Sequence, residues 1–388
     1  MTTTIDNEQK TLNVPNLRFP EFEGEWEENY VNEICNEFKS GKAIKADLIL
    51  DVGTYPVFGG NGLRGYTSTY NHDGLFVLIG RQGALCGNVR SVIGKTYITE
   101  HAIAVNGNNK SDTNFLHYLF LQMDLGRFSD QSAQPGLAVN KLLKLKVITP
   151  RIDEQRKIAN LLRLLDERIA TQNKIIDKLQ SLIKGLNNHL YQQYGNEIET
   201  SFADLGVSYS GLSGKTATDF GSGKPFITYL NVYSNNVIEE TSYQYVRMGE
   251  NEKQNIVRYG DVLFTLSSET PEEVGIGSVY LGNQEVYLNS FCFGVHITNI
   301  QKVFSSYLSY YISTTQFRKF IYPFAQGSTR FNLCKADFEK SKFKLPSLEN
   351  QKRIYESLKC LSGKVAAEDA ILKQYHSQKQ YLLRQMFI

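Results

Sequence analysis

The chain has 388 residues, 41% of them hydrophobic and 21% charged, which argues against a disordered or fibrous protein and leaves room for two or three domains with buried cores. Lys and Arg total 42 against 40 Asp and Glu, so the net charge of +2 does not distinguish a nucleic-acid-binding protein. No apolar run approaches the roughly 18 residues of a membrane span, residues 1–10 lack a signal-peptide core, and the five cysteines form no Cys-x-x-Cys pair. We therefore expect a cytoplasmic protein with no membrane contact and with reduced, buried thiols.

The predicted elements repeat along the chain. In the first half, short strands are predicted at 75–79, 88–93, 96–99 and 102–105, followed by an amphipathic helix at 115–128. In the second half the same order returns at 262–266, 277–281, 291–297 and 304–321. Sequence landmarks recur as well: Asp73-Gly-Leu-Phe-Val-Leu matches Asp261-Val-Leu-Phe-Thr-Leu, and Pro150 followed by Gln155-Arg-Lys-Ile matches Pro346 followed by Gln351-Lys-Arg-Ile. One module therefore occurs twice.

Each copy ends in a heptad pattern that follows a proline, a residue that suits a helix entrance. Apolar positions recur at alternating steps of four and three, as in a coiled-coil seam. The predicted seam is Ile158, Leu162, Leu165, Ile169, Gln172, Ile176 and Leu179 in the first copy, and Ile354, Leu358, Leu361, Val365, Glu368, Leu372 and Tyr375 in the second. Gln172 and Glu368 occupy the same position, where a polar group fixes the register. Two surface helices, each packed on its own domain, are the alternative. The apolar pattern of the first copy continues to Leu190, however, and a seam from Ile158 to Leu190 is about 50 Å long, which is too long for one small globule.

If a two-fold axis relates the copies, the two helices run antiparallel. The sequence thus predicts an α+β protein in which two homologous mixed α/β domains are separated by a long antiparallel two-helix coiled coil, as a pseudo-two-fold tandem repeat. The predicted divisions are globular domains at 15–150 and 195–346 and helices at 151–194 and 347–388.

Motifs for catalysis and metal binding are not convincing. Gly60-x-Gly62-x-x-Gly65 fits the dinucleotide-binding pattern, but no helix opening follows it, so a glycine-rich loop is the better interpretation. Gly214-Lys215-Thr216 resembles the end of a P-loop, but the required earlier glycine would fall at Tyr209. The six histidines never have metal-ligand spacing, and His101, within an apolar strand pattern, is interpreted as a structural histidine. We expect no catalytic residue, metal or cofactor in this chain.

Polar and glycine-rich loops at corresponding places remain as candidates for binding. They are Ser40-Gly-Lys42, Tyr55–Tyr66, Gly80-Arg-Gln-Gly83 and Gln131–Gly136 in the first copy, and Ser213-Gly-Lys215, Ser222–Pro225, Thr265–Ser268 and Gln326–Arg330 in the second. Arg, Lys, Asn, Gln and Ser donate hydrogen bonds to phosphates and base edges, and glycine lets the backbone come close. Such loops occur in any small β-rich domain, but their recurrence at equivalent places favours binding.

With these features the chain resembles the specificity subunit of a Type I restriction-modification enzyme over nearly its full length. The resemblance rests on the tandem repeat, the two proline-led helices, and the segments Leu17-Arg-Phe-Pro-Glu-Phe-Glu-Gly-Glu-Trp26, Ser40-Gly-Lys42 and Gly80-Arg-Gln-Gly83. It implies a non-catalytic subunit with two target-recognition domains, each reading one half of a split double-stranded DNA sequence. It also implies that the helices set the gap and dock two methyltransferase subunits, which bring the S-adenosylmethionine site, while separate motor-nuclease subunits cut.

Under this resemblance, the loops supply the predicted DNA contacts. They are Lys42, Asn61, Arg64, Tyr66, Arg81, Gln82 and Gln134 in the first copy, and Lys215, Lys224, Gln326, Ser328 and Arg330 in the second. Whether the Ser-Gly-Lys at 213–215 or the one at 222–224 opens the second copy stays open. The alternative function is a coiled-coil scaffold or adhesin-like protein with no nucleic-acid role, which the near-neutral charge would suit.

Overall fold

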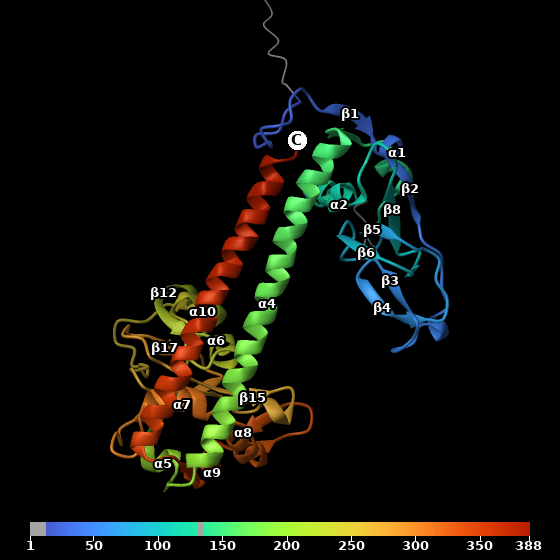
Figure 1. Ribbon diagram of the computed structural model, residues 1–388. Helices are drawn as coiled ribbons and strands as arrows, with labels where there is room; N and C mark the ends of the chain where they lie inside the picture. The colour runs from blue at the N-terminus through green and yellow to red at the C-terminus, as the bar shows by residue number, and fades with distance from the viewer. Residues whose placement is uncertain (1–12, 130–134) are drawn as a thin grey trace, which may run out of the picture. The chain divides into compact units, whose positions relative to one another are not determined.

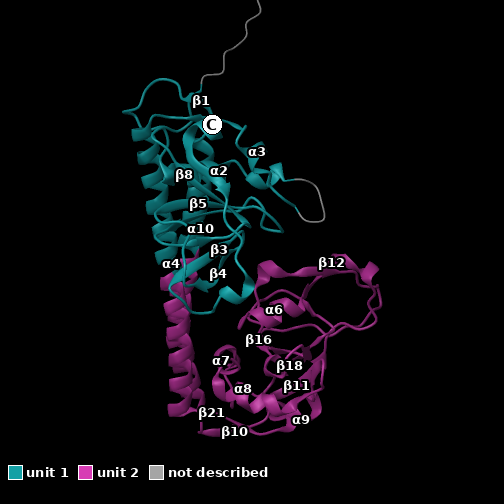
Figure 2. Ribbon diagram, turned by 90° about the vertical axis from the view of Figure 1, so that its right-hand side faces the viewer, with its two compact units in different colours: residues 1–173, 370–388 teal, residues 174–369 magenta. Residues whose placement is uncertain are grey.

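The computed structural model describes residues 13–129 and 135–388. The chain divides into Met1–Asn173 with Ala370–Ile388, here unit 1, and Lys174–Asp369, here unit 2, which Figure 2 distinguishes by colour. Each unit contains a mixed α/β domain and parts of two long helices, α4 (Ile152–Tyr194) and α10 (Leu348–Gln385), labelled in Figure 1.

Unit 1 is built on a four-stranded antiparallel sheet in the order β2-β8-β5-β6. In a second sheet, β4-β3-β7, strand β3 forms an antiparallel hairpin with β4 and pairs in parallel with β7, while β1 pairs with β9. The elements are β1 (Glu27–Tyr30), α1 (Val31–Ile34), β2 (Cys35–Ser40), β3 (Tyr55–Gly59), β4 (Gly62–Thr67), β5 (Leu75–Gly80), β6 (Val89–Ile93), β7 (Tyr97–Ile98), β8 (Ala102–Gly107), α2 (Thr113–Gln122), α3 (Val139–Leu142) and β9 (Lys146–Thr149).

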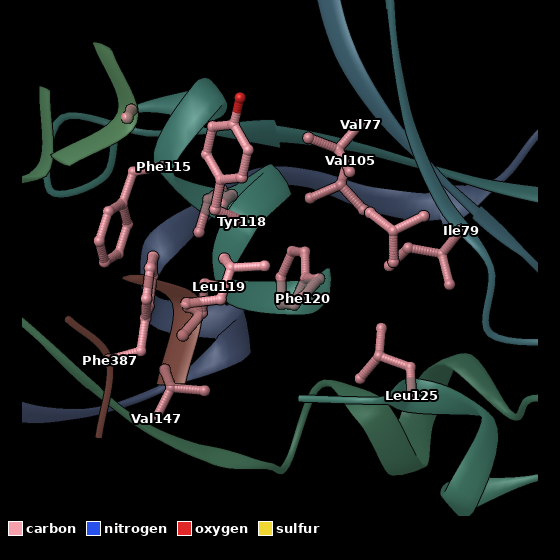
Figure 3. Close-up of a cluster of buried hydrophobic side chains, with 14 of the residues drawn as sticks. Val77, Ile79, Val105, Phe115, Tyr118, Leu119, Phe120, Leu125, Val147 and Phe387 are labelled. Carbon is pink, nitrogen blue, oxygen red and sulfur yellow. The ribbon is translucent and has the colours of Figure 1, made fainter. Parts of the chain in front are cut away.

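The position of β5 in the core explains its continuous apolar sequence. Successive side chains of a strand point to opposite faces of the sheet. Val77 and Ile79 join the buried cluster that contains α2, shown in Figure 3, whereas Phe76 and Leu78 join a second cluster with Ile98 of β7. Since both faces are covered, β5 has no polar face to present to water.

Unit 2 repeats this topology. Its main sheet has the order β11-β18-β14-β16, a second sheet β13-β12-β17 again contains one parallel pair, and β10 pairs with β21. A three-stranded sheet, β15-β20-β19, is added. The elements are β10 (Ile198–Thr200), α5 (Phe202–Leu205), β11 (Gly206–Ser210), β12 (Phe220–Ile227), α6 (Tyr229–Ser234), β13 (Gln244–Val246), β14 (Val262–Thr265), β15 (Ser267–Ser268), β16 (Gly277–Val279), β17 (Tyr287–Leu288), β18 (Cys292–Ile297), α7 (Ser305–Tyr311), α8 (Thr315–Ile321), β19 (Ala325–Gln326), β20 (Phe331–Leu333), α9 (Lys335–Lys340) and β21 (Phe343–Leu345). The predicted tandem repeat of mixed α/β domains is confirmed.

The helix segments within unit 1 run antiparallel. Near the start of α4, Glu154 accepts a hydrogen bond from Arg18, whose neighbour Leu17 donates its N–H to the Gln385 carbonyl at the end of α10. Farther along α4, the Asp166 carboxylate lies 2.5 Å from the Lys379 ammonium, which comes earlier in α10. Residues later in α4 therefore lie beside residues earlier in α10.

The helix segments within unit 2 have the same relation. Tyr310 of α7 links the two helices, because its carbonyl accepts from Asn187 of α4 while its hydroxyl contacts Ser362 of α10. Glu197, just beyond the end of α4, accepts a hydrogen bond from Asn350 near the start of α10. The segments of the two long helices are therefore antiparallel here too.

The predicted seam positions are covered by other parts of the protein. All fourteen are buried or half-buried, and the polar pair Gln172 and Glu368 is only 7% and 8% exposed. The heptad positions are therefore the covered positions of both helices, and their assignment to a coiled-coil seam stays a prediction.

Two glutamines fix the starts of the long helices in the same way. Gln155 is fully buried, and its amide N–H donates to the carbonyls of Lys110 and Pro150 at 2.9 and 2.8 Å. Gln351, also fully buried, donates to the carbonyls of Lys302 and Pro346, both at 2.9 Å. The repeated Pro-to-Gln spacing in the sequence therefore encodes a repeated anchor.

One predicted helix ends earlier than expected, and another is divided in two. The helix predicted at 115–128 stops at Gln122, because Asp124 adopts a left-handed conformation with φ of 47°, and a 3₁₀ helix follows at Leu125–Phe128. The segment 304–321 forms two helices, α7 and α8, since the Thr314 hydroxyl caps α8 by accepting a hydrogen bond from the Phe317 N–H.

The counterpart of Ser40-Gly-Lys42 in the second copy is neither Ser-Gly-Lys. Gly41 follows β2, and a Cβ there would overlap the Ile98 carbonyl. Gly211 follows the equivalent strand β11, and a Cβ there would overlap the Asn289 carbonyl. The matching segment is therefore Ser210-Gly211, which lies before both of the Ser-Gly-Lys segments between which the sequence left the choice open. A close backbone approach, rather than the lysine, is what the two copies share.

Candidate nucleic-acid interface

A surface pocket of about 440 Å³ in unit 1 brings together several of the predicted DNA-contact residues. It is lined by Gly59, Gly60, Asn61, Arg64, Gln82, Gly83 and His101. These residues come from the β3–β4 hairpin, the loop after β5, and the approach to β8. The segment Tyr55–Tyr66, expected as a loop, is thus mostly a hairpin, with Asn61 at its turn.

Backbone contacts form the floor of this pocket. A Cβ on Gly60 would lie 2.8 Å from the His101 carbonyl oxygen, and one on Gly80 would overlap the Leu85 carbonyl. The hairpin turn and the loop after β5 are therefore packed main chain against main chain, which only glycine permits. The polar side chains at the rim of the pocket are therefore carried by two segments whose backbones pack closely together.

Arg64 gives the pocket positive charge, and Arg90 lies against the neighbouring Gly62 of the hairpin. Arg64, exposed on β4, lays its stem across Gly59, where a Cβ would come within 2.8 Å of the Arg64 Cδ. The Arg90 guanidinium lies directly against Gly62, since a Cβ on that glycine would overlap it.

His101 has a different role from the one predicted. Its side chain is 44% exposed and lines the pocket, so it is not enclosed within the core. Its Nδ1 lies 3.0 Å from Gln82 Oε1, and its Nε2 lies 3.3 Å from Glu100 Oε1. His101 therefore contacts both Gln82, a predicted DNA-contact residue, and the carboxylate of Glu100.

The other predicted residues of the first copy lie in three settings. Lys42 is exposed just after β2, and Tyr66 is half-buried on β4, where it bridges to Leu50. Arg81 is half-buried, and its backbone bonds to His101 and Leu137. Gln134 lies outside the described residues.

In the second copy, three predicted residues meet on one hairpin. Gln326, Ser328 and Arg330 are exposed on the turn that joins β19 to β20. The turn is tight, since Gly327 has a φ of 139° and a Cβ on it would overlap the Arg330 carbonyl. The tight turn therefore fixes the backbone that carries these three exposed side chains.

Two tyrosines near this hairpin carried no sequence signal. Tyr229 and Tyr233 of α6 stack with ring centroids 6.0 Å apart. Burial raises the pKa of the Tyr229 hydroxyl, and the charge of Arg330 acts in the opposite direction. The Tyr229 hydroxyl donates to the Ser267 carbonyl of β15, which pairs with β20, so the aromatic pair lies beside the hairpin. Aromatic rings can stack on nucleic-acid bases.

The two predicted lysines of the second copy differ in how exposed their side chains are. The Lys215 side chain is only 8% exposed, and its ammonium donates to the Arg247 carbonyl and to Glu252, each at 2.5 Å. Hydrogen bonds from the Gly249 N–H and from Lys215 lower the pKa of Glu252 to about 2. Lys224, in contrast, is exposed on β12.

Among residues 13–129 and 135–388, no group of three or more His, Cys, Asp or Glu side chains is placed to hold a metal ion. Within the same ranges, none of the helices combines the length and the hydropathy that crossing a membrane requires.

Comparisons with known proteins agree with the repeat. The family model of the Type I restriction modification DNA specificity domain matches the chain twice, over residues 23–181 and 213–374. A 154-residue segment is 42% identical to the Type I restriction enzyme EcoprrI specificity subunit of Escherichia coli, covering 39% of this chain and 38% of that protein. The aligned part of the chain thus covers well under half the length of this curated relative.

Similarity to solved structures covers more of the chain than the sequence alignment to this relative does. The S subunit of a Type I restriction-modification system from M. genitalium superimposes with a TM-score of 0.61 at 17% identity, over 97% of this chain and 99% of that one. A structure describing complex assembly and conformational transition of the type I R-M system gives a TM-score of 0.56 at 16% identity, over 93% and 97%. Because the family model covers most of the sequence in two copies, the chain belongs to the Type I restriction-modification DNA specificity domain family.

Proposed function

We propose that this chain is the sequence-specific DNA-recognition subunit of a Type I restriction-modification complex, in which each of its two domains reads one half of a bipartite target. The observation that carries the proposal is the repetition of one topology, matched twice by the DNA specificity family, with donor-bearing loops exposed in both copies. The chain is a non-catalytic subunit, and methylation and cleavage belong to its partners.

The proposed division of the chain follows the repeat. Residues 15–150 and 195–346 are the reading domains, and the helical segments 151–194 and 347–388 set the gap between half-sites and dock two modification subunits. S-adenosylmethionine is bound by those modification subunits, and the motor-nuclease subunits join the same complex in the cytoplasm. The buried seam positions support this division, because a regular helix pair is a stiff element.

The proposed reading residues are those whose donors are exposed. In the first domain they are Asn61, Arg64 and Gln82, which share one pocket. Lys42, exposed just after β2, also belongs to the first set. In the second domain they are Lys224 and the hairpin residues 326, 328 and 330. Lys215 is placed outside this set, since its ammonium is already hydrogen-bonded within unit 2.

Two experiments test the proposal. Co-expression with the cognate modification subunits, followed by genome-wide mapping of modified bases, is expected to give a bipartite motif with a gap of fixed length. The purified assembly should also bind DNA with an affinity that falls steeply with salt, because phosphate contacts release counterions. A scaffold with no nucleic-acid role would show neither, and a contiguous motif would contradict the two-domain reading.

A further inference from the structure

We propose that Arg247 of unit 2 contacts a phosphate of the DNA backbone in the second half-site, and that the two Ser-Gly-Lys segments of the second copy hold it in place for that contact. This inference rests on the proposed function, because it assigns a backbone contact to one of the two reading domains. It is carried by the hydrogen bonds that converge on Arg247 and by the strand beside which it lies.

Both Ser-Gly-Lys segments contact Arg247, which directly follows β13. Lys215 of the first segment donates from its ammonium to the Arg247 carbonyl at 2.5 Å. In the second segment, the Ser222 hydroxyl accepts a hydrogen bond from Arg247 Nε at 3.2 Å, and a Cβ on Gly223 would lie 3.0 Å from the Arg247 Cα. The Arg247 N–H donates to the Asp219 carbonyl at 2.8 Å. The two segments therefore fix both the backbone and the side chain of one arginine.

The outer end of the Arg247 side chain remains available to an anion. A guanidinium carries five N–H donors and no acceptor, and the hydrogen bond to Ser222 uses only the one on Nε. Arg247 is exposed, and in the part of the chain that the structure describes its guanidinium has no carboxylate partner. The carboxylates of Asp219 and Glu252 already accept hydrogen bonds from other groups of this network. The four N–H groups of the two Nη atoms can therefore bind a phosphate.

The strand next to Arg247 corresponds to the strand of unit 1 that carries part of the candidate interface. The β3–β4 and β12–β13 pairs are equivalent, because each has one parallel partner, β7 or β17, and in each a tyrosine lies opposite a proline. These tyrosines are Tyr66 of β4, a predicted DNA contact, and Tyr245 of β13. Strand β4 also carries Arg64, which lines the pocket of unit 1. Arg247 therefore belongs to the same part of the repeated domain.

Tyr245 and Arg247 form an exposed pair on one face of the sheet. They lie two residues apart, so their side chains point to the same face, and Val246 between them is fully buried. Tyr245 is 49% exposed, and tyrosine and arginine both donate to DNA phosphates. Because Nε of Arg247 is held by Ser222, the side chain cannot extend fully into a groove about 8.5 Å deep. The phosphates, at the outside of the duplex, are within its reach.

Loss of this contact should change the salt dependence of DNA binding. The binding constant falls with about the −0.9 power of the salt concentration for each phosphate that is neutralised. One contact therefore contributes about 15-fold in affinity at 50 mM salt and about 4-fold at 200 mM salt. Arg247→Gln should lower the affinity by these factors for target and unrelated duplexes alike, and it should reduce the salt slope by about 0.9. The modified sequence motif should stay the same, because no base contact is lost.

The experiment uses the assembled complex of this chain with its modification subunits. DNA binding is measured between about 50 and 200 mM salt, and modified bases are mapped genome-wide. Arg247→Lys keeps the positive charge and should restore the slope. Ser222→Ala releases Nε and should weaken binding less than Arg247→Gln does, with the slope unchanged. Lys340→Gln removes an exposed cation of α9, outside the β12–β13 sheet, and is the matched control.

Each result separates the inference from the proposed function. An unchanged slope in Arg247→Gln, an equal change in Lys340→Gln, or no recovery in Arg247→Lys would overturn the inference while the bipartite motif still stands. Relaxation of one base position in Arg247→Gln would also overturn it, because Arg247 would then read a base. Wild-type affinity in Ser222→Ala would overturn the positioning role of the second Ser-Gly-Lys segment. Absence of any bipartite motif in the wild-type complex would instead refute the proposed function.

Discussion

Replacing Gln155 by Met tests whether the repeated glutamine anchor stabilises unit 1. Methionine keeps the length and volume of the side chain but loses the amide. Besides donating to two carbonyls, the Gln155 Oε1 accepts from the Ser111 hydroxyl at 3.2 Å and the Asp112 N–H at 2.9 Å. The four partners of the amide would each lose one hydrogen bond at a site where Gln155 itself is fully buried.

The magnitude follows from the burial of these partners. A buried polar group left without a partner costs about 1–3 kcal/mol. The Pro150 carbonyl and Ser111 belong to buried residues, whereas Lys110 is exposed and can turn its carbonyl to water. If the two buried groups bear the full cost and the other two bear little, we expect a loss of about 2–6 kcal/mol in the free energy of unfolding of unit 1.

Tryptophan fluorescence during urea unfolding can measure this loss in unit 1. Trp26 is the single tryptophan of the chain, it is 3% exposed, and its indole N–H donates to Glu154, the residue before Gln155. Gln378→Met, at an exposed position of α10 in the same unit, is the control and should change stability by less than about 0.5 kcal/mol. If Gln155→Met shifts the Trp26 transition no more than the control does, the anchor is not a stabilising feature.

Three further predictions concern unit 2. Gly211→Ala should destabilise it by about 3 kcal/mol in chemical unfolding, because the new methyl group overlaps the Asn289 carbonyl, and an unchanged midpoint would show that this close approach is not real. Gly185→Ala, within α4 and with open space around it, should instead stabilise by about 0.5–1 kcal/mol through helix propensity, and a loss of stability would contradict this. The low pKa of Glu252 means that its ionised form stabilises the fold above pH 4.5 and that this contribution is lost as the pH falls toward 2. Glu252→Gln should therefore flatten the pH dependence of stability in that window, measured by urea midpoints, whereas Glu250→Gln should leave the slope as it is.

Periodicity made the long helices and the repeat predictable. Heptad positions such as Leu162 and Leu358 depend only on the 3.5-residue repeat, which a sequence displays directly, and both are fully buried. The hydrogen-bonding role of Gln155 was not predictable, although its spacing from Pro150 was noticed, because the partners at 110–112 lie far away in sequence.

The candidate site was predictable in composition but not in geometry. The glycine-rich segments around Asn61 and Gln82 can be recognised in the sequence. They meet in one pocket because Tyr55–Tyr66 forms a hairpin, and this segment lacks the alternation of apolar and polar residues that would predict its strands. The apolar neighbours of His101 predict a buried strand and therefore a structural histidine. The structure places it where β8 is about to begin, so its side chain reaches the rim of the pocket.

The most direct test of the central claim compares one substitution from each domain in the assembled methylating complex. Modified bases are mapped genome-wide for the wild type, for Arg64→Ala in unit 1 and for Arg330→Ala in unit 2. The account predicts a bipartite wild-type motif in which Arg64→Ala relaxes one half and Arg330→Ala relaxes only the other. Two variants that alter the same half, or a motif without a gap, would contradict the claim that each repeat reads its own half of the target.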